Sequence, residues 1–69
     1  MKYYNLVVHD GVTPERLGPY AGSEEQLSAA RSVTEELDVE GGDSIFGIDV
    51  SDTGEPEVWT YSRDDLGLD

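Results

Sequence analysis

Residues 23–39 have the sequence SEEQLSAARSVTEELDV, which is the strongest helix signal in the chain. Ser23 is followed three residues later by Gln26, a spacing typical of a capping box. In that motif the serine hydroxyl accepts a hydrogen bond from a first-turn amide, and the glutamine side chain reaches back to the cap. Glu24 and Glu25 then occupy the first turn, where the helix dipole favours negative charge. The pattern predicts a helix capped by Ser23.

The polar and apolar side chains of this helix separate onto opposite faces at about 100° per residue. We predict that the helix runs from Glu24 to about Val39, because Gly41-Gly42 follows and glycine commonly ends helices. The apolar face holds Leu27, Ala30, Val33, Thr34 and Leu37. The opposite face holds Glu24, Glu25, Ser28, Ser32, Glu35 and Glu36. One face is therefore expected to pack on a sheet, and the other to face water or a partner.

Strand patterns flank the helix on both sides. Residues 2–9 are rich in aromatic and branched side chains, and residues 6–8 are apolar on both faces, which is typical of a central strand. A short strand around residues 15–17 could fold back on the first. Residues 44–51 and 57–62 alternate across a turn-rich linker, so we predict a hairpin.

Together these elements predict an α+β fold. We expect a small three- or four-stranded antiparallel or mixed sheet with one helix packed across one face, in the order β-(β)-α-β-β. Residues 1–69 should form a single acidic domain, because a chain of 69 residues has room for one modest core. Within the strand at residues 44–51, Phe46, Ile48 and Val50 share one face of the sheet.

The charge balance is extreme for so short a chain. Sixteen Asp and Glu residues stand against four Lys and Arg, a formal net charge of −12. So much like charge repels itself and exceeds what solubility needs, so something must either compensate for it or use it. It argues against direct binding to nucleic acid or to an anionic membrane. It also favours a monomer.

Cysteine is absent, which excludes disulfides and thiolate metal sites. No apolar stretch approaches the length of a signal-peptide core or a membrane span. We therefore expect a cytoplasmic protein.

The motifs that could carry chemistry are weak. Asp52-Thr53-Gly54 resembles the aspartic protease triplet, but a hairpin turn explains the same residues. A calcium loop counted from Asp49 would need a bidentate Glu where Thr60 stands. His9 lies beside an aspartate, but no nucleophile or second metal ligand accompanies it. Trp59 and Tyr61 are better explained by core or cross-strand packing than by an interaction surface. We expect no enzyme, no cofactor and no metal site.

The acidic residues of the helix and its flanks are the remaining candidates. A charged helix face is usually just solvated, but one Lys and three Arg cannot neutralise this one through i,i+4 pairs. Carboxylates spread over about 16 Å of helix axis can approach the charge density of duplex DNA, about one charge per 1.7 Å. We predict partner contacts at Glu24, Glu25, Glu35 and Glu36, flanked by Asp38, Glu40 and Asp43. The hairpin acids Asp49, Asp52, Glu55 and Glu57 form an alternative set.

A short, cysteine-free, strongly acidic chain with an acidic helix at residues 23–40 resembles the phage-encoded nucleic-acid mimics. These include restriction inhibitors, the uracil-DNA glycosylase inhibitor and anti-CRISPR proteins. In character the chain is most similar to small anti-CRISPR proteins that act on type I systems. The resemblance implies binding to a surveillance complex, best at its PAM-reading large subunit, in the cytoplasm of the host cell. Inhibition would then work by steric and electrostatic occlusion of the target DNA, not by catalysis.

The excess of acidic residues also fits two different classes of protein. A small domain from an extreme halophile is likewise acidic and Lys-poor, and it would need concentrated salt to hold its structure. An antitoxin or nuclease inhibitor would plug the basic cleft of a different partner by the same physics. Far-UV circular dichroism in dilute buffer separates the halophile from the mimics, and co-purification separates the mimics from each other.

Overall fold

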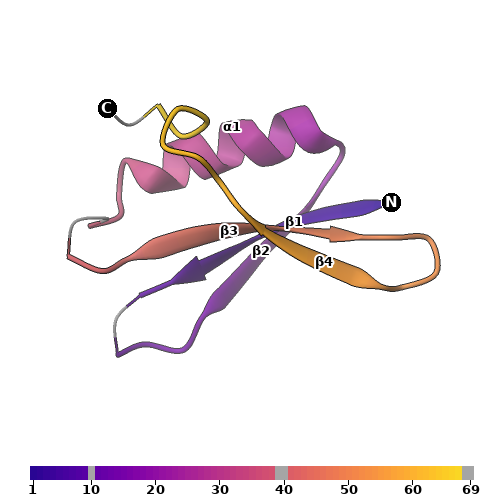
Figure 1. Cartoon of the computed structure of the whole chain (residues 1–69), viewed down its shortest axis with the longest axis horizontal. Helices are drawn as coiled ribbons and strands as arrows, with labels where there is room; N and C mark the ends of the chain where they lie inside the picture. The colour runs from indigo at the N-terminus through magenta and orange to yellow at the C-terminus, as the bar shows by residue number, and fades with distance from the viewer. Residues whose placement is uncertain (10, 39–40, 68–69) are drawn as a thin grey trace.

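The structure is a computed structural model and describes residues 1–9, 11–38 and 41–67. Its elements are β1 (Lys2–Val8), β2 (Glu15–Tyr20), α1 (Ser23–Thr34), β3 (Ser44–Val50) and β4 (Pro56–Thr60). Figure 1 shows α1 lying along one face of the sheet. The predicted α+β class, its element order and the packing of one helix across one sheet face are confirmed.

The strands form one antiparallel sheet of four, in the order β2-β1-β3-β4. β1, whose residues 6–8 are apolar on both faces, lies in the centre as predicted. The short strand expected around residues 15–17 is present as the longer β2 and folds back on β1. β3 and β4 form the predicted hairpin. The result is a thin two-layer molecule that measures 15 Å along its shortest axis.

The hydrophobic core lies between α1 and the sheet. Its buried members are Val7, Ala30 and Ile45, and the partly buried side chains packed against them are Leu17, Val33, Leu37, Tyr61 and Leu66. This arrangement confirms the apolar face that periodicity predicts for the helix. The polar face is also confirmed, since the residues assigned to it are exposed. α1 is thus held by one stripe and presents its acids to solvent.

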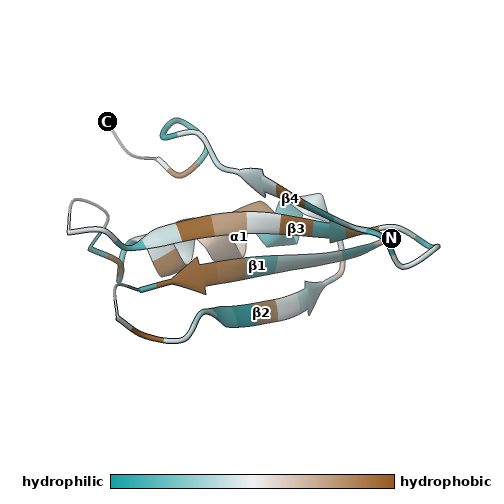
Figure 2. Ribbon diagram, turned by 60° about the horizontal axis from the view of Figure 1, so that its bottom comes forward, coloured by the Kyte–Doolittle hydropathy of each residue, from teal (hydrophilic) through white to brown (hydrophobic). Residues whose placement is uncertain are grey.

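The second face of the sheet has no helix over it in the part of the chain that the structure describes, and we call it the open face. The register pairs Leu6 with Phe46, and Ile48 with Val58, on this side. Figure 2 looks onto the open face with α1 behind the sheet, and hydrophobic stretches of the β1 and β3 ribbons lie side by side in it. The apolar face predicted for residues 44–51 therefore points away from the helix.

The helix ends earlier than predicted. α1 stops at Thr34 with Glu35 as its C-cap, so the expected end near Val39 is wrong. The next amides make tighter i→i−3 bonds, from Glu36 to the Val33 carbonyl (2.9 Å) and from Leu37 to the Thr34 carbonyl (3.2 Å). The Asp38 amide then donates to Asp43 Oδ2 at 2.9 Å, so a loop contact takes the place of a further helical hydrogen bond.

The start of the helix is also capped differently. Gly22 is the N-cap, no side chain caps the helix there, and the predicted Ser23–Gln26 capping box is wrong. The Gln26 side chain is instead buried against the sheet, with 1% of its surface exposed. Glu25 Oε2 instead accepts a hydrogen bond from the Ala21 amide, just before the N-cap, at 3.2 Å.

Candidate functional site

Two pairs of exposed glutamates stand at the two ends of α1. The N-terminal acid pair is Glu24 and Glu25 in the first turn, and the C-terminal acid pair is Glu35 and Glu36 just past Thr34. At about 1.5 Å per residue the pairs are separated by about 16 Å along the axis. Between them the outward side of the helix carries serines and Arg31. The predicted acidic face is therefore two clusters separated by a polar gap.

None of these four glutamates takes part in an ion pair among the described residues. Two of the cations have other contacts, although Arg31 stands on the same side of the helix. Arg31 uses its Nε to donate to the backbone carbonyl of Asp65 at 2.7 Å, which ties the C-terminal turn to the helix. Arg16 stacks over the ring of Tyr4, 4.8 Å from its centroid, on the open face. The charge on the helix side therefore remains available to a partner.

The loop that follows the helix uses its acids internally. Asp43 Oδ2 accepts a hydrogen bond from the Asp38 amide at 2.9 Å and lies 3.3 Å from His9 Nδ1. Asp38 Oδ1 accepts from the Gly41 amide at 2.9 Å, yet the residue stays exposed. Asp43 is half-buried, so it presents less carboxylate surface than the helix acids do. Glu40, the other predicted flanking contact, lies outside the described residues.

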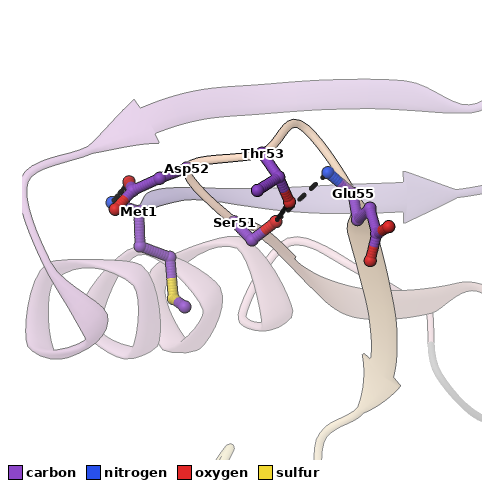
Figure 3. Close-up of polar contacts among 5 residues, drawn as sticks. All are labelled: Met1, Ser51, Asp52, Thr53 and Glu55. Atoms are coloured by element: carbon purple, nitrogen blue, oxygen red, sulfur yellow. Dashed lines mark hydrogen bonds and ion pairs between the residues drawn. The ribbon is translucent and has the colours of Figure 1, made fainter.

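The Asp52-Thr53-Gly54 triplet forms the hairpin turn between β3 and β4, as expected. Figure 3 shows Ser51 Oγ bonded to Thr53 Oγ1 at 2.8 Å and to the Glu55 amide at 3.2 Å. The Asp52 carboxylate binds the Met1 ammonium at 2.8 Å in solvent. The hydrogen bond and the positive charge of that ammonium lower the pKa of Asp52. This arrangement is that of a hairpin turn whose Asp52 carboxylate is engaged by the N-terminus.

A buried polar cluster that the sequence pattern does not predict lies beneath the N-terminal end of α1. Gln26 Nε2 donates to the Tyr4 carbonyl at 2.9 Å and to Asp49 Oδ1 at 3.1 Å. Asn5 Nδ2 donates to the Gln26 carbonyl at 3.0 Å, and Asn5 Oδ1 accepts from the Tyr61 hydroxyl at 2.5 Å. One signal could have revealed it, since Asn5 and Asp49 occupy core-side positions of strands that are otherwise apolar there.

A shallow hollow of about 260 Å³ opens beside this cluster, lined by Glu24, Asp49, Trp59, Tyr61 and Asp65 among others. The two aromatic rings, two residues apart along the chain, meet edge to face with 4.4 Å between centroids. Tyr61 packs against the core and Trp59 lies over Gly47 of the neighbouring strand, which confirms their predicted packing role. Burial and the nearby Asp49 charge raise the pKa of Tyr61, so its hydroxyl keeps the proton that it donates to Asn5 Oδ1. No group of three metal-ligating side chains occurs among residues 1–9, 11–38 and 41–67.

Comparison with known proteins adds no relative: no family model, curated protein or solved structure matches this chain. No helix in the described residues combines the length and apolar character needed to cross a membrane.

Proposed function

We propose that this chain is a polyanion-mimicking inhibitor. Its helix-side carboxylates occupy a cationic groove of a nucleic-acid-binding protein in place of DNA or RNA. The observation that carries the proposal is the exposed C-terminal acid pair, Glu35 and Glu36, which forms no ion pair within the described chain and stands at the wrong end of a helix dipole.

Negative charge at a helix C-terminus costs about 0.3–1 kcal/mol per group at low ionic strength. The two glutamates form no ion pair in the described chain and bury little surface. No contact of their side chains in this part of the chain therefore offsets the unfavourable interaction with the helix dipole. Residues that break a local rule without structural gain are expected where function requires them. The acids on the outer surface of α1 therefore have a better explanation in binding than in folding.

Their spacing also supports polyanion mimicry. The two acid pairs lie about 16 Å apart along the helix. On one DNA strand, phosphates rise by about 3.4 Å each, so this distance corresponds to about five nucleotides. A groove that holds a short duplex segment can then receive one pair near each end. Asp38 extends the C-terminal cluster by one exposed carboxylate.

We further propose that the target is the PAM-reading large subunit of a type I CRISPR surveillance complex, in the cytoplasm of the host cell, and that inhibition works by occlusion. Other basic nucleic-acid-handling proteins, including toxins and nucleases, offer the same kind of groove. The test is competition: the purified chain is added to a type I surveillance complex and binding of PAM-containing duplex is followed by mobility shift. We expect loss of DNA binding that weakens as salt rises, because salt screens the Coulomb attraction.

Matched charge reversals locate the surface. Glu24→Lys with Glu25→Lys, and Glu35→Lys with Glu36→Lys, should each abolish the competition. Glu55→Lys with Glu57→Lys makes the same change in net charge on the hairpin and should leave it intact. Full competition by both helix variants would move the site to the hairpin acids.

Absence of affinity for the complex and for other basic nucleic-acid-binding proteins at low salt would end the proposal. A chain that folds only in molar KCl would instead be a halophilic domain.

A further inference from the structure

The open face of the sheet is apolar across β1, β3 and β4. The residues that the register places there include Tyr4, Leu6, Val8, Phe46, Ile48, Val50 and Val58. Most are half-buried by their neighbours, and Val58 is 59% exposed. The uncovered face of an antiparallel sheet usually carries polar residues, and a contiguous apolar patch marks an interaction surface. Figure 2 shows this face in front, with the helix behind it.

Charge is segregated between the two faces. The acids of the strands, Glu15, Asp49 and Glu57, all occupy register positions on the helix side. The charged residues at open-face positions of the described strands are Lys2 and Arg16. A chain of net charge −12 therefore has one broad face from which strand carboxylates are excluded.

We infer that the open face binds the open face of a second copy of this chain. The dimer has four layers, helix-sheet-sheet-helix, with the two apolar faces in contact. The two-fold axis lies between the stacked sheets and runs parallel to the strands. It places β1 of one copy over β3 of the other, and β2 of one copy over β4 of the other. That arrangement keeps the Arg16 side chains of the two copies apart. Both acidic helix surfaces stay on the outside, so the inference neither requires nor opposes polyanion mimicry.

The size of the face favours another whole sheet as its occupant. Four strands about 4.8 Å apart, with five to seven residues of about 3.3 Å each, make a face of roughly 19 by 20 Å. Two such faces remove about 800 Å² in projection, so the relief of the side chains must supply the remainder of the roughly 1,000 Å² at which specific interfaces begin. A short peptide covers only part of the face, whereas a second sheet covers all of it and comes nearest to that limit.

The edge strands are poorly suited to the alternative mode of association, in which a strand of another chain pairs with the edge of the sheet. Both edge strands contain a proline, Pro19 in β2 and Pro56 in β4, and proline offers no N–H for pairing. Association through the face leaves these edges unused.

The salt dependence of this dimer should differ from that of binding to a cationic groove. Two copies of charge −12 repel each other, and the Debye length falls from about 30 Å at about 0.01 M salt to about 3 Å at about 1 M. The dimer should therefore strengthen as salt rises, whereas capture by a cationic groove should weaken.

Sedimentation equilibrium of the full chain at both salt concentrations, over a series of protein concentrations up to the millimolar range, tests the inference. We expect the mass to rise from 7.6 kDa toward twice that value, and to do so at lower protein concentration in high salt. A monomer throughout both series would overturn the inference and leave the proposed function untouched.

A substitution on the open face tests which surface is used. Val58→Lys changes an exposed residue, so the fold should survive, and far-UV circular dichroism checks this. Although it lowers the net negative charge, it buries an unpaired cation in each copy and should weaken the dimer by about tenfold or more. Ser28→Lys makes the same charge change on the exposed helix surface and should leave the dimer intact or strengthen it. A Val58→Lys chain that dimerises as well as Ser28→Lys would exclude the open face.

Discussion

Gln26 donates its side-chain amide to Asp49, with 3.1 Å between Nε2 and Oδ1. The same nitrogen also donates to the Tyr4 carbonyl at 2.9 Å. One buried side chain of the helix therefore binds two neighbouring strands at once, β1 through its backbone and β3 through a carboxylate. Buried acceptors need a donor, and this is the one that α1 supplies.

Gln26→Ala removes both hydrogen bonds and leaves two acceptors beneath the helix without their donor. We expect the free energy of unfolding to fall by about 2–3 kcal/mol, which urea denaturation followed by circular dichroism measures. Ser28→Ala on the exposed side of the same helix is the control and should change it by less than about 0.5 kcal/mol. Equal effects at the two positions would show that the Gln26 contacts contribute nothing.

Gln26→Glu should make the free energy of unfolding depend on pH. It places a second carboxyl beside Asp49, and two such groups cannot both ionise cheaply, so the pKa of one is raised in the folded state. A folded pKa above the unfolded value means stability that is present at acidic pH and lost as pH rises through the raised pKa. The variant should approach wild-type stability in acid and lose it toward neutrality. A loss that is constant with pH would contradict this.

Tyr61, which directly follows β4, is linked to β1 by its hydroxyl, which donates to Asn5 Oδ1. Burial, together with the Asp49 charge, raises the pKa of Tyr61 above its unfolded value near 10. The stability that the protonated hydroxyl provides is therefore complete below about pH 10 and declines as pH rises above it. Tyr61→Phe should cost about 1–3 kcal/mol at neutral pH, because Asn5 loses its donor, and should flatten the alkaline decline.

The control for this prediction is Tyr4→Phe, which removes a hydroxyl with no hydrogen bond in the described structure. Its unfolding curves should follow the wild type at neutral pH and keep the alkaline decline. If Tyr61→Phe loses stability in alkali as steeply as Tyr4→Phe does, the Asn5–Tyr61 bond is not the titrating contact.

The fold was largely predictable from the sequence because burial follows simple periods. The 3.6-residue repeat of Leu27, Ala30 and Thr34 placed the helix stripe, and the two-sided apolar run of residues 6–8 placed β1 in the centre. Exposure of the four helix glutamates followed from the same repeat.

The missed features depend on contacts between distant segments. Gln26 matches a local capping rule, but the buried acceptors of β1 and β3 hold it more strongly than the helix end does. The inward orientation of Asp43 could not be predicted from local sequence, because it depends on the hydrogen bond between residues 38 and 43 that closes the loop. The position of Asp49 is different, because strand alternation alone puts it on the same sheet face as Ile45.

Gly47 makes room for Trp59, the single tryptophan of the chain. A methyl group at Gly47 would overlap the Trp59 ring. Gly47→Ala should therefore displace the ring and destabilise the fold by about 1–3 kcal/mol through overpacking, with a change in tryptophan fluorescence. In a Trp59→Leu background the same substitution should cost much less. A double-mutant cycle measures this coupling, and additive costs would mean that Ala is accommodated without moving the ring.

The acid pairs of α1 make opposite predictions for stability and the same prediction for binding. Glu24→Gln with Glu25→Gln removes negative charge from the favourable end of the dipole. It also weakens the bond that the Ala21 amide donates to Glu25, because a neutral amide oxygen accepts less strongly than a carboxylate, so the fold should be destabilised by about 0.5–1 kcal/mol. Glu35→Gln with Glu36→Gln removes charge from the unfavourable end and should stabilise it by about 0.5–1 kcal/mol at low salt. Thermal melts at low and high salt measure both effects, which should shrink together as salt screens the dipole.

If the acids serve a cationic groove, both double variants should nevertheless compete less well with DNA for the target. A C-terminal variant that gains stability and keeps full competition would show that those glutamates have no part in binding.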